Sequence, residues 1–301
     1  MYWHVSEEFL SPGIKNTVIG NTSSRDSVVD IFAGRALGPQ FAYRPGFKVD
    51  FGVNTPFDNW SVDFEWTRIK EEITTNYDIG TIGTPNDQVS WTSLWNTPTN
   101  KPIHTKWSFY LNLFDLSLAR PFYEGKRLIV SPLMGLRGIT LDQNTRYKST
   151  STNWITPATL DVDYISHLWG IGPRLGADLA WLLYKEFRII GSGTGSLLYT
   201  RYTSNKTVPH QSPSTPDVKV TAFAPFESVA NPEFSALRAN LELDLGLGWG
   251  TYFSDQKYHI DFRATYDFQA FFKMNVMSAL VNSWIGDIYM HGLTVSGRFD
   301  F

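Results

Sequence analysis

The residues of this chain that could perform hydrolytic chemistry are a histidine and a carboxylate spaced for a β-strand. His259 and Asp261 lie two positions apart, so both side chains would point to one face of a strand. An imidazole beside a carboxylate can activate water as a general base, which makes a protease one alternative for the function. Such pairs also occur on ordinary polar strand faces. The six histidines show no spacing typical of a metal site, and we expect neither a metal nor a cofactor.

Two glycine-rich stretches could cradle a phosphate group. They are residues 191–195 (Gly-Ser-Gly-Thr-Gly) and the step Gly170-Ile171-Gly172. Neither is followed by Lys-Ser or Lys-Thr, and no strand–helix unit surrounds them, so nucleotide binding is not expected. Glycine at every second position is better explained by close packing along the wall of a barrel. The chain has no cysteine, which excludes a disulfide framework and a thiolate metal site.

The charged residues that could act together lie at alternate positions of long two-faced segments. From Leu237 to Trp249, and again from Tyr258 to Phe268, apolar residues alternate with polar or small ones. Successive strand side chains point to opposite faces, so each segment is a strand with one apolar and one polar face. We expect the polar faces to line a lumen through Arg137, Arg174, Asp178, Arg238, Glu242, Asp244, Asp261, Arg263 and Asp267.

The length of these strands predicts that they cross a membrane. They exceed ten residues, whereas globular strands average about five or six. If the apolar face meets lipid, the charged side chains must turn inward, because Arg or Lys facing the bilayer centre costs roughly 2–4 kcal/mol. The same alternation recurs from Phe47 to Val53, from Trp60 to Trp66 and from Trp169 to Trp181.

Composition agrees with this interpretation and excludes other classes. The chain has 301 residues, a net charge of −3, 15% aromatic residues and 11 tryptophans. The small net charge gives no reason to expect nucleic acid as a partner. No apolar run is long enough for a transmembrane helix. Residues 1–301 read as a single domain, and because no secretory signal is present we expect that the N-terminus is truncated.

The order of strands, turns and loops predicts an all-β fold: a closed, antiparallel, up-and-down transmembrane β-barrel. We expect about ten strands, with about twelve as the alternative if a long loop hides a hairpin. Short turns fall near 56–59, 121–126, 182–186 and 253–257. The polar stretches 70–105, 142–165, 203–233 and 273–288 read as long loops. In outer-membrane barrels the short turns are periplasmic and the long loops are extracellular.

Three local irregularities are expected. The apolar positions shift by one near Phe114, which predicts a β-bulge. Pro173 within a paired strand predicts another bulge. Residues 27–37 could form a short helix.

Aromatic residues gather near both ends of the predicted strands. Tryptophan and tyrosine are enriched at membrane–water interfaces, and we expect this position for Trp60, Trp66, Trp107, Trp169, Trp181, Trp249 and Tyr258. Phe299 and Phe301 end the chain on an apolar strand face. This ending resembles the C-terminal signature that outer-membrane barrels present to their assembly machinery.

Several motifs resemble one family. The most specific are residues 169–176 (Trp-Gly-Ile-Gly-Pro-Arg-Leu-Gly) and 195–199 (Gly-Ser-Leu-Leu-Tyr), supported by residues 45–49, 65–68 and 136–138. They resemble the Legionella-type (Lpg-type) major outer membrane protein family over nearly the whole chain. The resemblance implies a pore-forming β-barrel in the bacterial outer membrane, a porin, and it brings no catalytic residues. The short N-terminus departs from the family.

These observations favour a barrel through which small hydrophilic solutes diffuse passively, without enzymatic activity. Its expected partners are the outer-membrane lipid bilayer, the barrel-assembly machinery and the solutes. An open and a filled lumen are equally compatible with the strand number, since about eight strands enclose only side chains and about 16–18 enclose a channel. The resemblance favours the pore. The alternatives are a surface adhesin without conductance, an outer-membrane protease and a soluble barrel that holds an apolar ligand.

Overall fold

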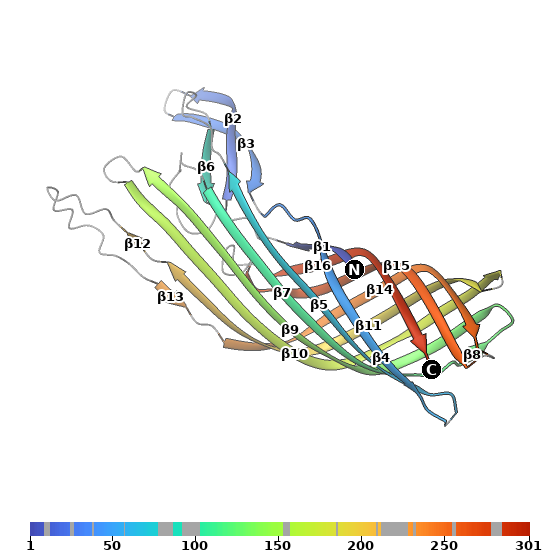
Figure 1. Ribbon diagram of the computed structural model, residues 1–301. Helices are drawn as coiled ribbons and strands as arrows, with labels where there is room; N and C mark the ends of the chain where they lie inside the picture. The colour runs from blue at the N-terminus through green and yellow to red at the C-terminus, as the bar shows by residue number, and fades with distance from the viewer. Residues whose placement is uncertain are drawn as a thin grey trace.

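The protein is an antiparallel β-barrel accompanied by a small second sheet (Figure 1). The computed structural model describes residues 1–8, 13–24, 27–37, 39–56, 58–77, 87–91, 103–152, 157–184, 186–208, 210–211, 228–230, 233–254, 257–277 and 285–301.

Ten strands close into the barrel, which confirms the predicted fold class and strand number. Neighbours around the barrel run antiparallel, and β1 joins β16 to β4. The barrel strands are β1 (Tyr2–Glu7), β4 (Tyr43–Asn54), β5 (Ser61–Tyr77), β7 (Ile103–Ala119), β9 (Leu128–Thr152), β10 (Pro157–Tyr184), β11 (Phe187–Val208), β14 (Glu233–Phe253), β15 (Tyr258–Asn275) and β16 (Gly286–Asp300).

Shorter strands accompany the barrel. β8 (Tyr123–Glu124), β12 (His210–Gln211) and β13 (Ser228–Ala230) pair with its wall. β2 (Gly13–Ser24), β3 (Ser27–Leu37) and β6 (Asp87–Trp91) form the second sheet in the order β3-β2-β6. The helix predicted over 27–37 is therefore wrong, because this segment pairs with β2 as a strand. No helix of the described residues is long and apolar enough to cross a membrane.

Short turns join the strands at one end of the barrel, at the predicted positions. Asp58 and Asn59 between β4 and β5 have φ of 56° and 55°, and Ser254 after β14 has φ of 55°. Asn, Asp and Ser tolerate this left-handed conformation better than bulky residues do, which explains why they occupy the turns.

The expected long loops are shorter than predicted because the strands continue into them. β5 reaches Tyr77, β9 reaches Thr152 and β10 starts at Pro157, within the ranges 70–105 and 142–165. Likewise β11 runs to Val208 within the range 203–233. The described outward side chains of these extensions, such as Lys70 and Asp142, are polar, so the sequence alone did not separate these strand ends from loops.

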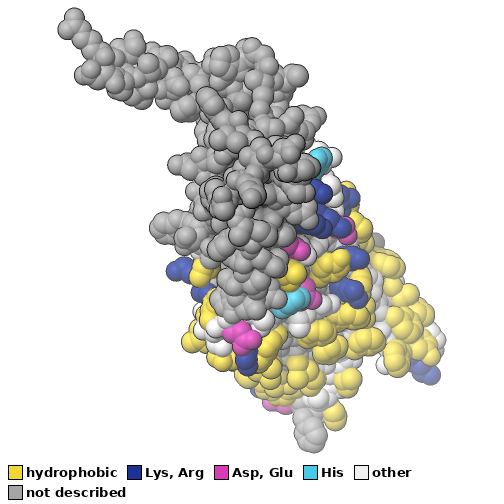
Figure 2. Space-filling view, turned by 90° about the vertical axis from the view of Figure 1, so that its left-hand side faces the viewer, with side chains coloured by type: hydrophobic (Ala, Val, Ile, Leu, Met, Phe, Trp, Pro, Cys, Tyr) yellow, Lys and Arg dark blue, Asp and Glu magenta, His cyan; other side chains and the backbone are white. Residues whose placement is uncertain are grey.

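In the half of the barrel near the short turns, apolar side chains face outward. On β14 the outward Leu237, Leu245 and Leu247 are 65%, 66% and 59% exposed, whereas the inward Asn240 and Glu242 are 3% and 2% exposed. Figure 2 shows broad areas of hydrophobic side chains over the described barrel surface. Solvent exposure of this much apolar surface fits a wall that contacts lipid. We call this part of the barrel the transmembrane half.

In the other half of the barrel the pattern is reversed, with polar side chains on the outer face and apolar side chains on the inner face. On β5 the outward positions become Arg68, Lys70 and Glu72, while the inward Ile69 and Ile73 are buried. We call this part the rim; on β5, β7, β9 and β10 it comprises residues 68–77, 103–112, 140–152 and 157–168. Where its side chains are described, the outer surface is polar and suits water, and the interior holds buried apolar side chains together with several buried polar ones.

The exchange of faces explains the apparent shift on β7, and the β-bulge predicted near Phe114 is wrong. Trp107, Leu111 and Leu113 point inward, Phe114 and Leu116 point outward, and the pairing with β5 and β9 continues without a register shift. The apolar residues change sides because the surroundings change, from water outside the rim to lipid outside the transmembrane half.

On neighbouring strands the outward residues change from apolar to polar at about the same level of the wall. Outward Trp66 pairs with Phe114, and two residues further Arg68 pairs with Asn112. On β10, Trp169 is 47% exposed on the outer face, and His167 is the next outward residue. Trp at such a boundary is typical of a membrane interface. We take this level as the outer edge of the lipid-facing wall.

Pro173 causes no bulge, so this prediction is also wrong. Its strand keeps one register with β11 on both sides of the proline, and the pairing only omits Gly172 and Pro173. On the other side Pro173 pairs with Leu136 of β9. A proline lacks only its N–H group, and a locally omitted pair accommodates that loss.

The first strand closes the barrel along the rim and the outer part of the wall. Its pairs with β16 run from Tyr2 opposite Leu293 to Glu7 opposite Ile288. Met1 and Gly46 exchange two backbone hydrogen bonds of 3.0 and 3.2 Å. Gly292 is required here, because a Cβ atom would lie 2.2 Å from the Tyr2 carbonyl oxygen.

A charge placed on the outer face should separate the two halves energetically. We expect Leu245→Arg to lower the free energy of unfolding in lipid vesicles by roughly 2–4 kcal/mol, because the guanidinium would face hydrocarbon. Ser235→Arg on the outer face of the same strand, beyond the lipid level, should change it by less than about 1 kcal/mol. Denaturant titration in vesicles measures both, and equal losses would contradict the assigned level.

Candidate functional site

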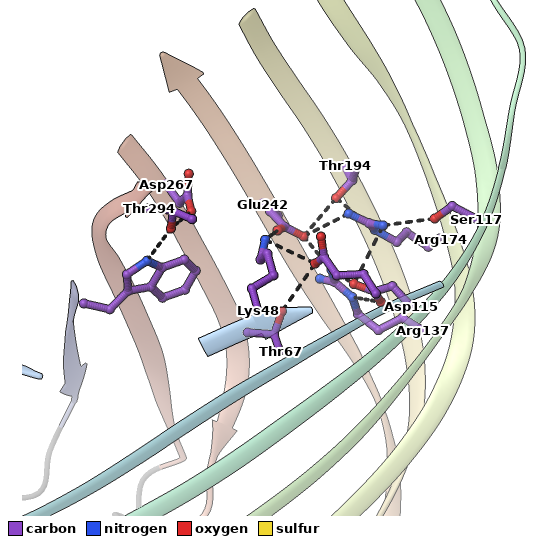
Figure 3. A network of polar contacts seen from close by, with 12 residues as sticks. Lys48, Thr67, Asp115, Ser117, Arg137, Arg174, Thr194, Glu242, Asp267 and Thr294 are labelled. Carbon is purple, nitrogen blue, oxygen red and sulfur yellow. Dashed lines mark hydrogen bonds and ion pairs between the residues drawn. The ribbon is translucent and has the colours of Figure 1, made fainter. Parts of the chain in front are cut away.

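Six charged side chains from six different strands meet inside the transmembrane half (Figure 3). All lie at inward positions of the alternating pattern. They form what we call the ion network: Lys48 of β4, Glu65 of β5, Asp115 of β7, Arg137 of β9, Arg174 of β10 and Glu242 of β14.

Arg137 is the centre of the ion network. Its Nε and Nη2 atoms donate to the two carboxylate oxygens of Asp115 at 2.7 and 2.6 Å. Nη2 also donates to Glu242, and Nη1 donates to the amide oxygen of Asn240. The side chain is 0% exposed. A fully buried guanidinium needs such partners, since an unpaired buried charge is strongly destabilising.

Two further cations complete the ion network. Arg174 donates through Nη2 to Glu242 at 3.1 Å and through Nη1 to Ser117 at 3.2 Å. Lys48 lies with its Nζ 3.1 Å from Glu65 and 3.8 Å from Glu242. Three cations thus face three carboxylates, so the formal charges of the ion network cancel.

The ion network crosses the lumen. Arg137 and Glu242 come from β9 and β14, which are separated by β10 and β11 in the wall. Lys48 and Glu242 come from β4 and β14, with β15, β16 and β1 between them. Side chains that bridge strands this far apart around the wall occupy the interior at this level.

A second layer lies above the ion network, inside the rim. Its members are large aromatic side chains that are at most 2% exposed, and we call them the aromatic layer: Trp3, Trp107, Phe109, Tyr147, Tyr164, Tyr202 and Phe271. Trp107 stacks on Phe109 with ring centroids 5.6 Å apart. Tyr147 meets Tyr164 edge-on at 6.0 Å. Rings packed this way exclude water and add contact energy beyond burial.

Two buried carboxyl groups, Glu7 and Glu71, lie at inward positions: Glu7 shares a strand with Trp3 of the aromatic layer, and Glu71 pairs in the backbone with Phe109. Glu7 accepts a hydrogen bond of 2.6 Å from Gln143, and no side chain donates a hydrogen bond to either carboxylate oxygen of Glu71. Burial raises the pKa of each from 4.5 to about 8. Both groups lie in the rim, where a buried carboxyl group is more stable in its protonated, neutral form.

The other predicted lumen residues also occupy inward positions. Asp261 pairs with Arg188 and with Arg263, the latter at 3.2 Å. Asp267 accepts a hydrogen bond from Thr294, and that hydroxyl accepts one of 3.0 Å from Trp3 (Figure 3). The remaining three residues are Asp178, Arg238 and Asp244.

The histidine and carboxylate spaced for hydrolysis do not meet. His259 Nδ1 lies 2.9 Å from Asp300 of the neighbouring strand β16, and the ring packs on Tyr252. Asp261 is occupied by Arg188 and Arg263. His259 and Asp261 therefore contact different partners and do not form an imidazole–carboxylate pair with each other.

Six of the seven predicted interface aromatics occupy the barrel exterior or its turns. Trp169 and Trp181 mark the two ends of the lipid-facing part of β10, at 47% and 52% exposed. The others are Trp60, Trp66, Trp249 and Tyr258. Trp107 is the correction: it is 0% exposed and belongs to the aromatic layer. Its strand has already passed into the rim, where aromatic residues point inward.

The two C-terminal phenylalanines lie on the outer face. Phe299 and Phe301 are 53% and 97% exposed, and Phe299 stacks on Tyr258 of β15. An exposed apolar strand end is available for recognition by other proteins. Its use by an assembly machinery remains a prediction.

The sequence did not single out three members of the ion network. Lys48, Glu65 and Asp115 stand at alternate polar positions of the same kind as the predicted residues. Applying the alternation rule to β4, β5 and β7 would have found them. Their partners could not be found in this way, because the partners depend on how the barrel closes.

A comparison with protein families matches residues 6–301 to the Legionella pneumophila major outer membrane protein precursor family. The chain belongs to this family. A comparison with curated proteins finds no match. Membership and the apolar outer wall together place the protein in the bacterial outer membrane. In other barrels of this membrane the short turns face the periplasm, and we expect the same orientation here, with the rim on the outside.

Removing the centre of the ion network should be costly. We expect Arg137→Met to lower the free energy of unfolding by about 3–5 kcal/mol, because Asp115 and Glu242 lose a buried partner. The control is Arg120→Met, which breaks an exposed pair with Asp58 at a turn and should cost at most about 1 kcal/mol. Equal losses in denaturant titrations would show that the ion network is not a buried charge cluster.

The rim should lose stability as pH rises. Because the pKa of Glu7 and Glu71 is raised to about 8 by burial, their contribution is complete below pH 4.5 and is lost as pH approaches 8. We expect heat-induced unfolding to occur at lower temperature at pH 8.5 than at pH 5.

The variant Glu7→Gln/Glu71→Gln should flatten this pH dependence. Glu72→Gln, a substitution of the neighbouring outward carboxylate that pairs with Lys106, is the control and should keep it. If both variants keep the wild-type profile, the two buried carboxyl groups are not its source.

Proposed function

We propose that this protein is a closed outer-membrane barrel that anchors a water-exposed rim at the cell surface, where it serves as a structural surface protein. One observation carries this proposal: the lumen is filled at two successive levels. Arg137 of the ion network and Trp107 of the aromatic layer are both 0% exposed. They stand on neighbouring strands that pair directly, with Arg137 opposite Asp115 and Trp107 opposite Thr145.

A filled lumen opposes diffusion for two physical reasons. A hydrated solute needs a continuous path of water, and the ion network interrupts this path with side chains that cross the interior. The aromatic layer then adds an apolar barrier, which hydrated ions cross only at high cost. The wall cannot widen easily, because widening would break backbone hydrogen bonds in an environment without water.

A second candidate function is porin-like passive diffusion of small hydrophilic solutes. It is favoured by the polar surface below the ion network, where the inward Arg263 and Arg298 side chains are 40% and 42% exposed. These exposed charged side chains would meet water at the end of the lumen near the short turns. Transport would require both the ion network and the aromatic layer to open. Neither candidate function involves an enzymatic reaction.

Recordings in planar lipid bilayers distinguish the two functions. We expect no reproducible conductance steps from the wild-type chain. The variant Arg137→Ser/Trp107→Ala, which removes one large side chain from each layer, should increase ion leakage. Flotation of the same preparations with vesicles controls for insertion. Reproducible wild-type steps of one amplitude would overturn the closed-barrel proposal and support diffusion.

A further inference from the structure

Two cations without an ion-pair partner among the described residues lie on the outer surface of β5, at the edge of the lipid-facing wall. Arg68 and Lys70 are consecutive outward residues of β5, directly above the outward Trp66. Residues two apart on a strand face are separated by about 7 Å. Both side chains are exposed, and they stand where the wall passes from lipid to water. We call Arg68, Lys70, Tyr110 and Asn112 the cationic patch.

Neighbouring carboxylates do not neutralise the cationic patch. Glu72, the next outward residue of β5, pairs with Lys106 at 2.5 Å. Asp142 of β9, which pairs in the backbone with Tyr110, contacts His167 at 2.6 Å. Among the described residues, no carboxylate lies within the 4.0 Å ion-pair distance of Arg68 or Lys70. Glu72 acts on Lys70 only at longer range, and its ion pair is with Lys106, so both cations of the patch can attract an external anion.

The surrounding side chains suit a phosphate group. Lys70 Nζ lies 5.0 Å from the centre of the Tyr110 ring, which orients the ammonium group along the wall. Arg68 pairs in the backbone with Asn112, and Lys70 with Tyr110. The patch thus joins a guanidinium and an ammonium with a phenol and an amide on adjacent strands. Asn112 Nδ2 donates to Thr140 at 3.1 Å and keeps a second N–H, so each of the four groups has a donor for phosphate oxygens.

We propose that the cationic patch binds the phosphate groups of lipids in the outer leaflet. The position of the patch favours a lipid over free phosphate as the ligand. The outward apolar residues Phe64, Trp66 and Phe114 lie directly below the patch and would contact the acyl chains of that lipid. A phosphorylated lipid would therefore contact the apolar wall with its acyl chains and the cationic patch with its phosphate. Arg201 of β11, which pairs in the backbone with the boundary residue Trp169, already has Glu233 as an ion-pair partner at 3.2 Å, unlike Arg68 and Lys70.

The test measures binding of lipid A with two phosphate groups to the full chain folded in detergent. Each Lys or Arg near an anionic lipid surface contributes about a fivefold affinity, so Arg68→Gln/Lys70→Gln should weaken binding roughly thirtyfold. The control Arg120→Gln/Arg201→Gln removes the same charge from two ion-paired positions and should leave affinity within about twofold. Heat-dependent gel mobility confirms that each variant is folded.

Two further arms identify the source of the phosphate. Dephosphorylated lipid A should bind the wild-type chain as weakly as lipid A binds the double variant, and added sodium chloride should weaken only the phosphorylated lipid. Inorganic phosphate at the same phosphate concentration should not compete. The proposal is overturned if the double variant binds like the wild type, if the dephosphorylated lipid binds equally well, or if inorganic phosphate displaces the lipid.

Discussion

The structure depends on the exclusion of water from the lipid that surrounds one half of the wall. There every backbone N–H and C=O group must find a partner within the protein, which ten strands achieve by closing on themselves. The same constraint sorts the side chains. Where lipid lies outside, leucine and phenylalanine point outward and charged residues point inward. Beyond the lipid, on β5 and β7, the two faces exchange roles within one residue step.

This sorting creates the interior. Charged residues that cannot face lipid are collected in a narrow lumen, where burial would be very costly without partners, and the ion network supplies them. In the rim, the water outside allows the apolar residues to turn inward and form the aromatic layer. A barrel of ten strands is small enough for both layers to fill it. The burial of both layers inside the barrel thus follows from the membrane boundary and the strand number together.

Alternation in the sequence, together with the order of short turns and long loops, predicted the barrel and its strand number. Alternation also predicted inward positions for residues such as Arg174 and Glu242. It could not show which surroundings each face meets, so Trp107 was placed at the membrane interface and the shift near Phe114 was interpreted as a bulge. The rim strands were read as loops for the same reason. The contact between Lys48 and Glu242 was also out of reach, because it joins strands distant in both sequence and wall order.

The most direct test of this account is a cysteine scan of β7, which is straightforward because the chain contains no cysteine. Spin labels at residues 108–118 in vesicles would be probed with oxygen, which enters lipid, and with a water-soluble nickel complex. We expect labels at Ser108 and Asn112 to respond to nickel and labels at Phe114 and Leu116 to respond to oxygen. Labels at the odd-numbered positions should respond weakly to both. If the outward-facing residues changed from even-numbered to odd-numbered positions between residues 112 and 116, the exchange of faces at the membrane boundary would be wrong.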